Sequence, residues 1–468
     1  MLVLLACVGQ FLVVLDVSIV NVALPSMDAA LNLGPAGTQW VVNAYVLLFA
    51  GLLLVGGRLA DLVGVRRVLL TGLALVAGAS LLGGTATDAA TLIVARAGQG
   101  LGAALLAPAT MTLLTTTVPE GTRRHRALAV WTAVGLTGGT LGNLLGGVIT
   151  EYLTWRWVLF VNVPLAVVAG LLAVRAPGTD GVPRRRSVDL PGAVLATVGL
   201  VSLTFGVVTA GTHGWRAPTT WAALILAAAV FAAFVVVEWR WAPVPLLPPS
   251  LFRIRSVARG NVVLLLAGAC LNPMWYFLTF AMQGVLGLGP LATGFGFLPH
   301  TVLTIVVGVW LTPRLMRAVA HRTLVVAGAV VAAAGFVWQS GLTADTGYPA
   351  GFLGPAILIA LGGGLLNTPA TVLATSGVDP RDAGAASGLL NTAKQVGAAV
   401  GLAVLVTVVR PDAGSRDADA LADTYGLAFL ALALVSATTA VAALLLPRSG
   451  EISRVGTSPS GVASDQPG

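Results

Sequence analysis

The sequence predicts an all-α integral membrane protein with about fourteen transmembrane helices. Its 468 residues are 57% hydrophobic and only 9% charged, and the mean hydropathy is +0.92, whereas about a quarter of the residues in soluble domains are charged. Apolar runs of roughly twenty residues recur along the whole chain, and a helix of that length crosses the hydrocarbon core of a bilayer. A water-soluble fold cannot bury this much apolar surface, so we expect lipid around the protein.

The spans can be placed in order from the apolar runs and from the charged, proline and glycine residues between them. The first six are expected near 2–24, 39–60, 68–86, 89–116, 126–149 and 156–174. Two more are expected near 188–211 and 219–238, and the last six near 260–286, 291–312, 322–342, 350–374, 384–409 and 424–446. The first run lacks a convincing cleavage motif and many similar runs follow it, so we interpret it as a span and not as a signal peptide.

This order divides the chain into four parts. A first six-helix bundle is expected over 1–175, and a basic cytoplasmic loop with an inserted helix pair over 176–255. A second six-helix bundle is expected over 256–447. Residues 448–468 are rich in Ser, Gly and Pro and are expected to form a disordered cytoplasmic tail.

The placement of the 26 basic residues predicts the orientation in the membrane. If the N-terminus is cytoplasmic, twenty of them lie on cytoplasmic loops and helix ends, as the positive-inside rule requires. Arg96 and Lys394 lie within spans, and the exceptions on the outside are Arg156, Arg216, Arg410 and Arg416. Both termini are therefore expected in the cytoplasm, with the protein in the plasma membrane. The net charge of +8 follows from this orientation and from contact with anionic lipid headgroups, so no nucleic-acid partner is expected.

The sequence offers no pattern typical of an enzyme or a cofactor site. Cys7 and Cys270 lie in apolar runs without a CxxC spacing or a nearby histidine, so neither a disulfide nor a metal site is expected. We find no phosphate-binding loop and no nucleophile constellation. The expected function is transport driven by an ion gradient, by a monomer without cofactors.

Three charged side chains are placed deep in spans, where each is a candidate functional residue. Asp16 in the first span and Arg96 in the fourth lie at similar depth when 1.5 Å is counted per residue. We expect them to pair, with Gln99 one turn further along the Arg96 face. A carboxylate beside a guanidinium stays ionised, whereas a desolvated carboxylate without that partner takes a proton. A motion that separates the pair would therefore drive proton uptake and release, although a static tie between helices remains an alternative.

Lys394, the only lysine of the chain, is placed near the midplane of the thirteenth span. Asn391 and Gln395 are expected on the same helix face. The ammonium could hold an anionic or carbonyl-bearing substrate, or it could be a neutral structural donor.

The ninth span carries a proline and a cluster of aromatic residues. Asn272 and Pro273 interrupt the helix, which membrane proteins tolerate beside a cavity. Trp275, Thr279 and Met282 share a face and are candidates, with Gln283, for an apolar and adaptable substrate pocket. Alternatively, these aromatic side chains pack against neighbouring helices or face the lipid.

Several motifs resemble those of the fourteen-helix drug:proton antiporter branch of the major facilitator superfamily. The run from Leu15 to Pro25, LDVSIVNVALP, resembles the signature of this branch in its first helix. The resemblance implies that Asp16 takes part in proton coupling. Asn21, in the same run, is a further candidate substrate-binding residue. The resemblance to this branch covers nearly the whole chain.

The loop between the second and third spans resembles the cytoplasmic loop motif of the superfamily. Gly57-Arg58-Leu59-Ala60-Asp61 and Gly64-Val65-Arg66-Arg67 carry the likeness. The implied role is a conformational latch between the two bundles, formed by Gly57, Asp61, Gly64 and Arg66. A tight turn with orienting charges is the alternative.

Two further motifs lie on the fourth and fifth spans. Arg96-Ala97-Gly98-Gln99-Gly100 resembles the segment whose arginine is associated with proton transfer. The residues that resemble the antiporter motif of the fifth helix are Gly138, Gly142, Gly146 and Gly147, with Asn143 where the motif has proline. Small residues at such spacings also allow helices to pack closely whatever the function.

The start of the sixth span and the segment from Ser387 to Gly397 also resemble this branch. The resemblance implies two six-helix bundles with a substrate site between them near the midplane, transport by rocking of the bundles, and a peripheral position for the inserted helix pair.

The sequence therefore predicts a proton-coupled exporter of small amphipathic compounds such as antibiotics. Because Asp16 is the only acid deep in a span, neutral, zwitterionic or anionic hydrophobic substrates are expected rather than dications. An uptake symporter or facilitator can share the same architecture. A membrane sensor that binds a ligand without transport is a third possibility.

Overall fold

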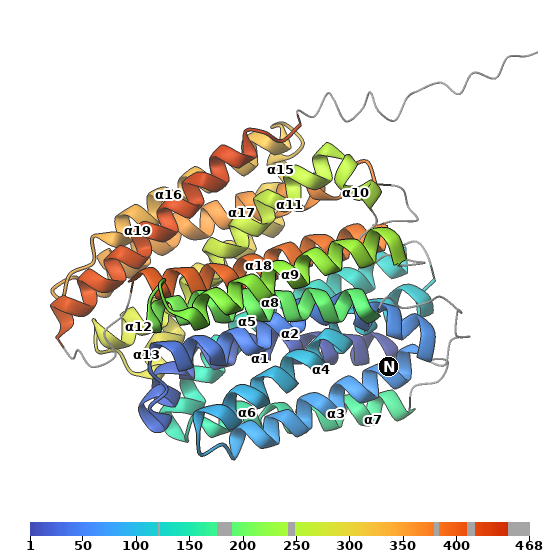
Figure 1. The fold of residues 1–468 in the computed structure, drawn as a ribbon, viewed down its shortest axis with the longest axis horizontal. Coiled ribbons are helices and arrows are strands. Elements are labelled where there is room, and N and C mark those ends of the chain that lie inside the picture. The colour runs from blue at the N-terminus through green and yellow to red at the C-terminus, as the bar shows by residue number, and fades with distance from the viewer. Residues whose placement is uncertain (120–121, 176–189, 242–248, 379–382, 410–416, 448–468) are drawn as a thin grey trace, which may run out of the picture.

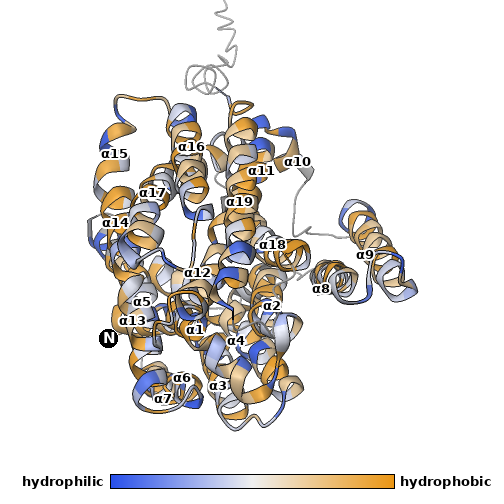
Figure 2. Ribbon diagram, turned by 90° about the vertical axis from the view of Figure 1, so that its left-hand side faces the viewer, coloured by the Kyte–Doolittle hydropathy of each residue, from blue (hydrophilic) through white to orange (hydrophobic). Residues whose placement is uncertain are grey.

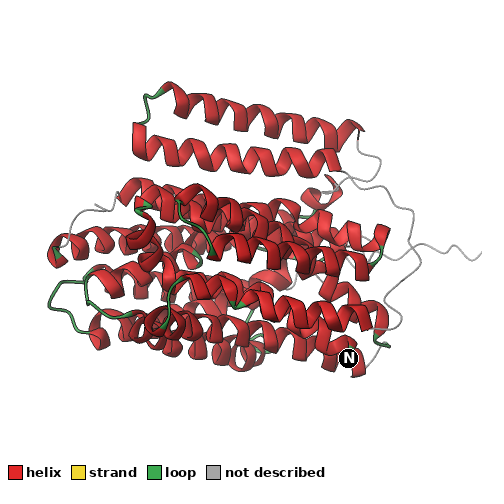
Figure 3. Cartoon of the chain, turned by 90° about the horizontal axis from the view of Figure 1, so that it is seen from below, coloured by secondary structure: helices red, strands yellow, loops and turns green. Residues whose placement is uncertain are grey.

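A computed structural model describes residues 1–119, 122–175, 190–241, 249–378, 383–409 and 417–447. Every regular element within these ranges is helical (Figure 3). Fourteen helical segments among them are long and apolar enough to cross a membrane. The expected fold class and number of spans are therefore confirmed. The proposed tail over 448–468 and most of the basic loop that begins at 176 lie outside the described residues.

The first half of the chain supplies six spans. Its helices are α1 (Leu2–Leu31), α2 (Gly34–Val63), α3 (Val65–Gly84), α4 (Ala89–Thr117), α5 (Thr122–Tyr152), α6 (Arg156–Phe160) and α7 (Asn162–Arg175). Together α6 and α7 form the sixth span. Helix α1 packs against α5 and α4, while α4 also packs against α2 and α3. These contacts place α1 and α4, which carry Asp16 and Arg96, next to each other.

The second half supplies another six spans, several of them from broken helices. Its helices are α11 (Arg255–Leu271), α12 (Pro273–Gly284), α13 (Pro290–Gly296), α14 (Leu298–Val306), η2 (Val307–Leu311), α15 (Thr312–Leu315), α16 (His321–Ser340), η3 (Pro349–Leu353), α17 (Gly354–Ala374), α18 (Ala383–Val409) and α19 (Ala418–Ala443). The break between α11 and α12 falls at Asn272 and Pro273, where proline lacks a backbone donor. Helices α11, α16, α17 and α19 pack on one another (Figure 1).

The inserted pair comprises α8 (Leu190–His213) and α9 (Pro218–Val236), followed by η1 (Val237–Trp241) and α10 (Pro249–Arg253). Helix α9 lies outermost and packs mainly on α8 (Figure 2). Helix α8 packs against α2 and α18, where Thr407 Oγ1 donates to the Val207 carbonyl at 3.1 Å. Both helices lie to one side of the two bundles, as expected of a peripheral pair, and α8 is the member that packs along the seam between the halves (Figure 2).

The first two spans are longer than the sequence suggested. We expected the first to end near 24, before Pro25, but α1 continues through Pro25 to Leu31. One proline removes a single backbone hydrogen bond, and packing against neighbouring helices compensates for that loss inside a membrane. The second span begins at Gly34, where we had expected 39.

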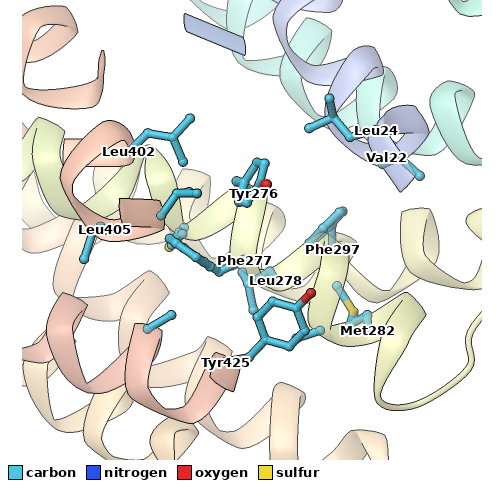
Figure 4. Packing of buried hydrophobic residues seen from close by; sticks show 14 of the residues in the cluster. Val22, Leu24, Tyr276, Phe277, Leu278, Met282, Phe297, Leu402, Leu405 and Tyr425 are labelled. Atoms are coloured by element: carbon cyan, nitrogen blue, oxygen red, sulfur yellow. The ribbon is translucent and has the colours of Figure 1, made fainter. Parts of the chain in front are cut away.

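The buried apolar residues form separate clusters at one end of the molecule and a shared cluster at the other. One cluster near the chain start, with Leu5, belongs to the first half alone, and another, with Leu446, belongs to the second half alone. A third cluster joins both halves, with Leu24 of α1, Tyr276 of α12 and Leu405 of α18 among its members (Figure 4). The two halves are thus packed together at the end opposite the N-terminus.

Candidate functional site

A buried ion pair joins α1 and α4 inside the first half. Arg96 Nη1 lies 2.8 Å from Asp16 Oδ2, and both residues are only 2% exposed. Gln99 Nε2 donates to Asp16 Oδ1 at 2.8 Å, and Arg96 Nη1 also donates to Gln99 Oε1 at 2.8 Å. The expected contact between Asp16 and Arg96, with Gln99 beside it, is present in the structure.

Two further side chains complete this cluster, and the sequence analysis gave neither of them a role. Asn162 Nδ2 on α7 donates to Asp16 Oδ1, and Ser80 Oγ on α3 accepts from Gln99 Nε2 at 2.8 Å. Both residues are fully buried. Asn162 is a lone amide in an apolar run and belongs to the start of the sixth span, whose resemblance to the branch was the other signal that could have identified it. Asp16 thus accepts three hydrogen bonds from the protein, and its carboxylate is held by α4 and α7 together.

Arg96 also holds the second helix. Its Nε donates to the Val41 carbonyl at 3.2 Å, and its guanidinium lies 4.5 Å from the centre of the Tyr45 ring. Gly100, one turn beyond Arg96, allows this approach because a Cβ there would lie 2.3 Å from the Tyr45 carbonyl oxygen. Arg96 therefore contacts both Asp16 of α1 and the backbone and Tyr45 ring of α2.

A cavity of about 240 Å³ lies between the two halves, and Tyr45 is one of its lining residues. Residues of α1, α2, α5, α12, α14 and α18 line it, together with Asn272 at the break before α12. Its apolar surface includes Val46, Trp275 and Leu402. The side chains on its wall that can form hydrogen bonds are Ser18, Asn21, Asn43, Tyr45, Asn143, Asn272, Trp275, Tyr276, Thr301 and Gln395.

Four of the eight predicted substrate-binding residues line a cavity. Asn21, Trp275 and Gln395 line the central one. Gln283 lines a second cavity of about 400 Å³ nearer the shared apolar cluster, and its Nε2 donates to the Val22 carbonyl at 3.0 Å. This second cavity also contains Asp28, an acid that the predicted end of the first span had excluded from the membrane.

The other four predicted substrate-binding residues do not line either cavity. Thr279 is buried and donates to the Trp275 carbonyl of its own helix, and Met282 packs in the shared apolar cluster. Lys394 Nζ points to Thr371 Oγ1 of α17 at 3.4 Å, and Asn391 donates to the Ser387 carbonyl. The expected common face of Lys394 and Gln395 is wrong, because adjacent helical residues point about 100° apart and only Gln395 turns toward the cavity.

The glycines of α5 lie at two close helix contacts, one with α1 in the same half and one with α13 in the second half. A Cβ on Gly138, Gly142 or Gly146 would meet α1 at 2.5–3.2 Å. A Cβ on Gly147 would lie 2.6 Å from the carbonyl oxygen of Pro290, which is the first residue of α13 in the second half. Asn143 is 4% exposed and lines the central cavity. This segment therefore allows α5 to pack closely on α1 of its own half and on α13 of the second half.

The proposed latch residues lie at the junction of α2 and α3. Gly64 has φ +94°, a conformation that favours glycine. Arg66 Nη2 donates to the Val174 carbonyl of α7, a contact within the first half. Gly57 lies on α2 beside Pro108 of α4, and the side chain of Asp61 lies outside the described residues. The latch across the two halves stays a prediction.

Comparison with known sequences identifies a family model and close relatives. The model described as Major Facilitator Superfamily matches residues 6–402. The chain is 53% identical over 448 residues to the cephamycin export protein of Amycolatopsis lactamdurans, covering 95% of this chain and 91% of that one. It is 41% identical to the puromycin resistance protein of Streptomyces alboniger, covering 86% and 80%. It is 38% identical to the lincomycin resistance protein of Streptomyces lincolnensis, covering 93% and 89%.

Solved structures show the same fold at lower identity. A peptide transporter of the POT type in complex with sulfate matches with a TM-score of 0.68 at 18% identity, over 95% of each chain. An auto-inhibited peptide transporter of the POT family matches with a TM-score of 0.68 at 14% identity, over 100% of this chain and 99% of that one. At this identity the likeness concerns the fold alone.

Proposed function

This chain belongs to the major facilitator superfamily and is a multi-span membrane transporter, and we propose that it exports small amphipathic antibiotics in exchange for protons. Relatives named for antibiotic export or resistance support the substrate class. The main support for proton coupling is the buried pair of Asp16 and Arg96 near the central cavity. An ionisable pair within a membrane-spanning bundle is typical of a proton relay.

In this proposal both termini face the cytoplasm and the protein works as a monomer in the plasma membrane, with protons and the antibiotic as its partners and no nucleic acid. The shared apolar cluster then lies toward the outside, which supports a conformation whose outer end is closed. Thr38 of α2 and Tyr276 of α12 form a hydrogen bond of 2.8 Å at that end. Substrate would therefore enter from the cytoplasmic side.

The coupling step follows from the contacts of Arg96. When Asp16 takes a proton from outside, the attraction that holds Arg96 weakens, and so does the hold of Arg96 on the Val41 carbonyl. Helix α2 carries Asn43 and Tyr45 in the cavity wall, so its movement changes the shape of the site. Release of the proton to the cytoplasm restores the pair and accompanies substrate capture. Proton and substrate need only favour different conformations for exchange to occur.

The test is proton movement in proteoliposomes with an imposed pH gradient, on addition of a small panel of antibiotics and dyes. The native protein should release protons from the acidic side when substrate is added, and Asp16→Asn should abolish this signal while substrate binding persists. Flux in the same direction as the protons would indicate an uptake symporter. Binding without accumulation would indicate a sensor. Either result, or coupling that survives Asp16→Asn, would contradict the proposal.

A further inference from the structure

Two buried amides in the central cavity have hydrogen-bonding atoms without a partner in the protein. Asn43 of α2 is 0% exposed, and among the described residues neither its Nδ2 nor its Oδ1 has a partner. Asn143 of α5 is 4% exposed, and its Oδ1 also lacks a partner. Both residues line the cavity between the halves. Because buried polar groups in native proteins are nearly always paired, each such group calls for an explanation.

The cavity wall around these amides carries no charge. None of its described lining residues is Asp, Glu, Lys, Arg or His. Instead five amides line it, namely Asn21, Asn43, Asn143, Asn272 and Gln395. An amide side chain is both a donor and an acceptor, so it can pair with a carbonyl, an amide or a hydroxyl group of a ligand. Asp16 and Arg96 are not among its lining residues, and they pair with each other while the Arg96 guanidinium lies over the Tyr45 ring.

The sequence of this chain makes the second amide possible. Asn143 stands where the resembled antiporter motif has proline, and a proline would offer no side-chain donor or acceptor at this point of the wall. The neighbouring residues Gly139 and Val46 leave the amides beside apolar surface. The site therefore combines uncharged polar groups with an apolar wall, which suits an amphipathic ligand.

We propose that Asn43 and Asn143 form an uncharged hydrogen-bonding subsite that selects electrically neutral, carbonyl-rich or amide-rich substrates over cations. This inference rests on the proposed export function and names the substrate class of the same cavity. A cation here would lose its hydration without meeting a carboxylate, whereas a neutral amide or carbonyl would satisfy the buried groups of the protein. Selectivity arises because a compound without such groups leaves the two asparagines unpaired.

The subsite predicts opposite effects on stability and on binding. Asn43→Leu removes two unpaired buried groups, so the ligand-free protein in detergent should melt at a higher temperature than the native protein. The same variant should bind chloramphenicol, a neutral amide with hydroxyl groups, about tenfold more weakly. That factor corresponds to about 1.4 kcal/mol. A purely structural asparagine would instead lower the melting temperature when replaced.

The experiment measures the dissociation constant of radiolabelled chloramphenicol and of the cationic dye ethidium in detergent, without a proton gradient. Asn143→Leu should weaken chloramphenicol binding in the same way, and Asn43→Asp should weaken it while strengthening ethidium binding. Thr204→Val is the matched control, because Thr204 Oγ1 is also buried without a partner but lies on α8, away from the cavity. This control should leave both dissociation constants unchanged.

The inference is overturned if chloramphenicol binds the Asn43 and Asn143 variants within twofold of the native protein, or if the native protein prefers ethidium. Should Asn43→Leu fail to fold, Asn43→Asp and Asn143→Leu give the same test. Because binding is measured without a gradient, its outcome is separate from proton coupling. Unchanged binding in the variants refutes the subsite and leaves proton-driven export intact, whereas absent coupling with intact selectivity refutes the exporter and leaves the subsite.

Discussion

Replacing Asp16 by asparagine tests whether the buried pair is a proton site or a tie between helices. The carboxylate accepts from Arg96 on one oxygen and from Gln99 and Asn162 on the other. An asparagine presents one oxygen and one NH₂ group. In either orientation of the asparagine side chain, its NH₂ group faces a hydrogen-bond donor. Arg96, which is only 2% exposed, also loses its counter-ion and remains as a buried charge. The change therefore removes a charge and also breaks hydrogen bonds.

The size of the effect follows from this burial. Removal of one partner of a buried ion pair destabilises a protein by about 3–5 kcal/mol. Arg96 keeps Gln99 Oε1 and the Val41 carbonyl as acceptors, so we expect the lower end, about 3 kcal/mol. Removing the second charge as well relieves the penalty of an uncompensated buried charge, although the hydrogen-bond mismatch at residue 16 stays. The double variant Asp16→Asn/Arg96→Gln should accordingly recover about half of the loss, roughly 1.5 kcal/mol.

The assay combines reversible unfolding in mixed micelles with substrate-driven proton movement in proteoliposomes. If Asp16 carries the coupled proton, the double variant regains stability but shows no proton movement. If the pair only holds the two helices together, the stable and uncharged double variant should regain transport as well. Recovery of both stability and proton-coupled transport in the double variant would refute the assignment of Asp16 as the proton site.

Two further changes test the contacts between the halves. Gly147→Ala places a Cβ 2.6 Å from the backbone of α13, so it should destabilise the described conformation by about 1–3 kcal/mol and slow transport in vesicles. Gly170→Ala, with no atom within 4 Å of its Cβ, should leave the rate unchanged. Thr38→Val removes the 2.8 Å bond to Tyr276 and should shift the population toward opening at that end by about two- to tenfold, measured as spin-label distances between α1 and α12. Thr137→Val, which loses only a bond within its own helix, should not shift the distances.

The sequence was sufficient for features that depend on depth in the membrane. Span number follows from hydropathy, and the contact of Asp16 with Arg96 follows from charge at matched depth in two spans. The direction of a side chain around its helix was harder to predict. Lys394 was predicted near the midplane as a candidate substrate ligand, but its Nζ points to Thr371 Oγ1 of α17 and it is not among the residues that line the cavity. Thr279 and Trp275 were predicted on one face, yet only Trp275 reaches the cavity.

Uncharged polar residues in apolar runs account for most of what the sequence did not show. Asn162 and Asn43 each interrupt an apolar run in the same way, but Asn162 bonds to Asp16 and Asn43 lines the cavity. An amide at such a position can bond to a backbone, bind a charged residue or face a ligand, and hydropathy does not distinguish these roles. The packing of α2 and α7 against α1 and α4 decides between them.

Helix α2 connects every part of the proposed mechanism. Its Val41 carbonyl accepts from Arg96, its Asn43 and Tyr45 line the cavity, and its Thr38 bonds to the second half. These residues lie within about two helical turns, which is roughly 11 Å along the axis. A small movement of this segment on loss of the Arg96 contact would therefore reach the cavity and the outer contact together. Coupling between proton and substrate then requires no long pathway, because one rigid segment contacts the proton cluster, the substrate site and the opposite half.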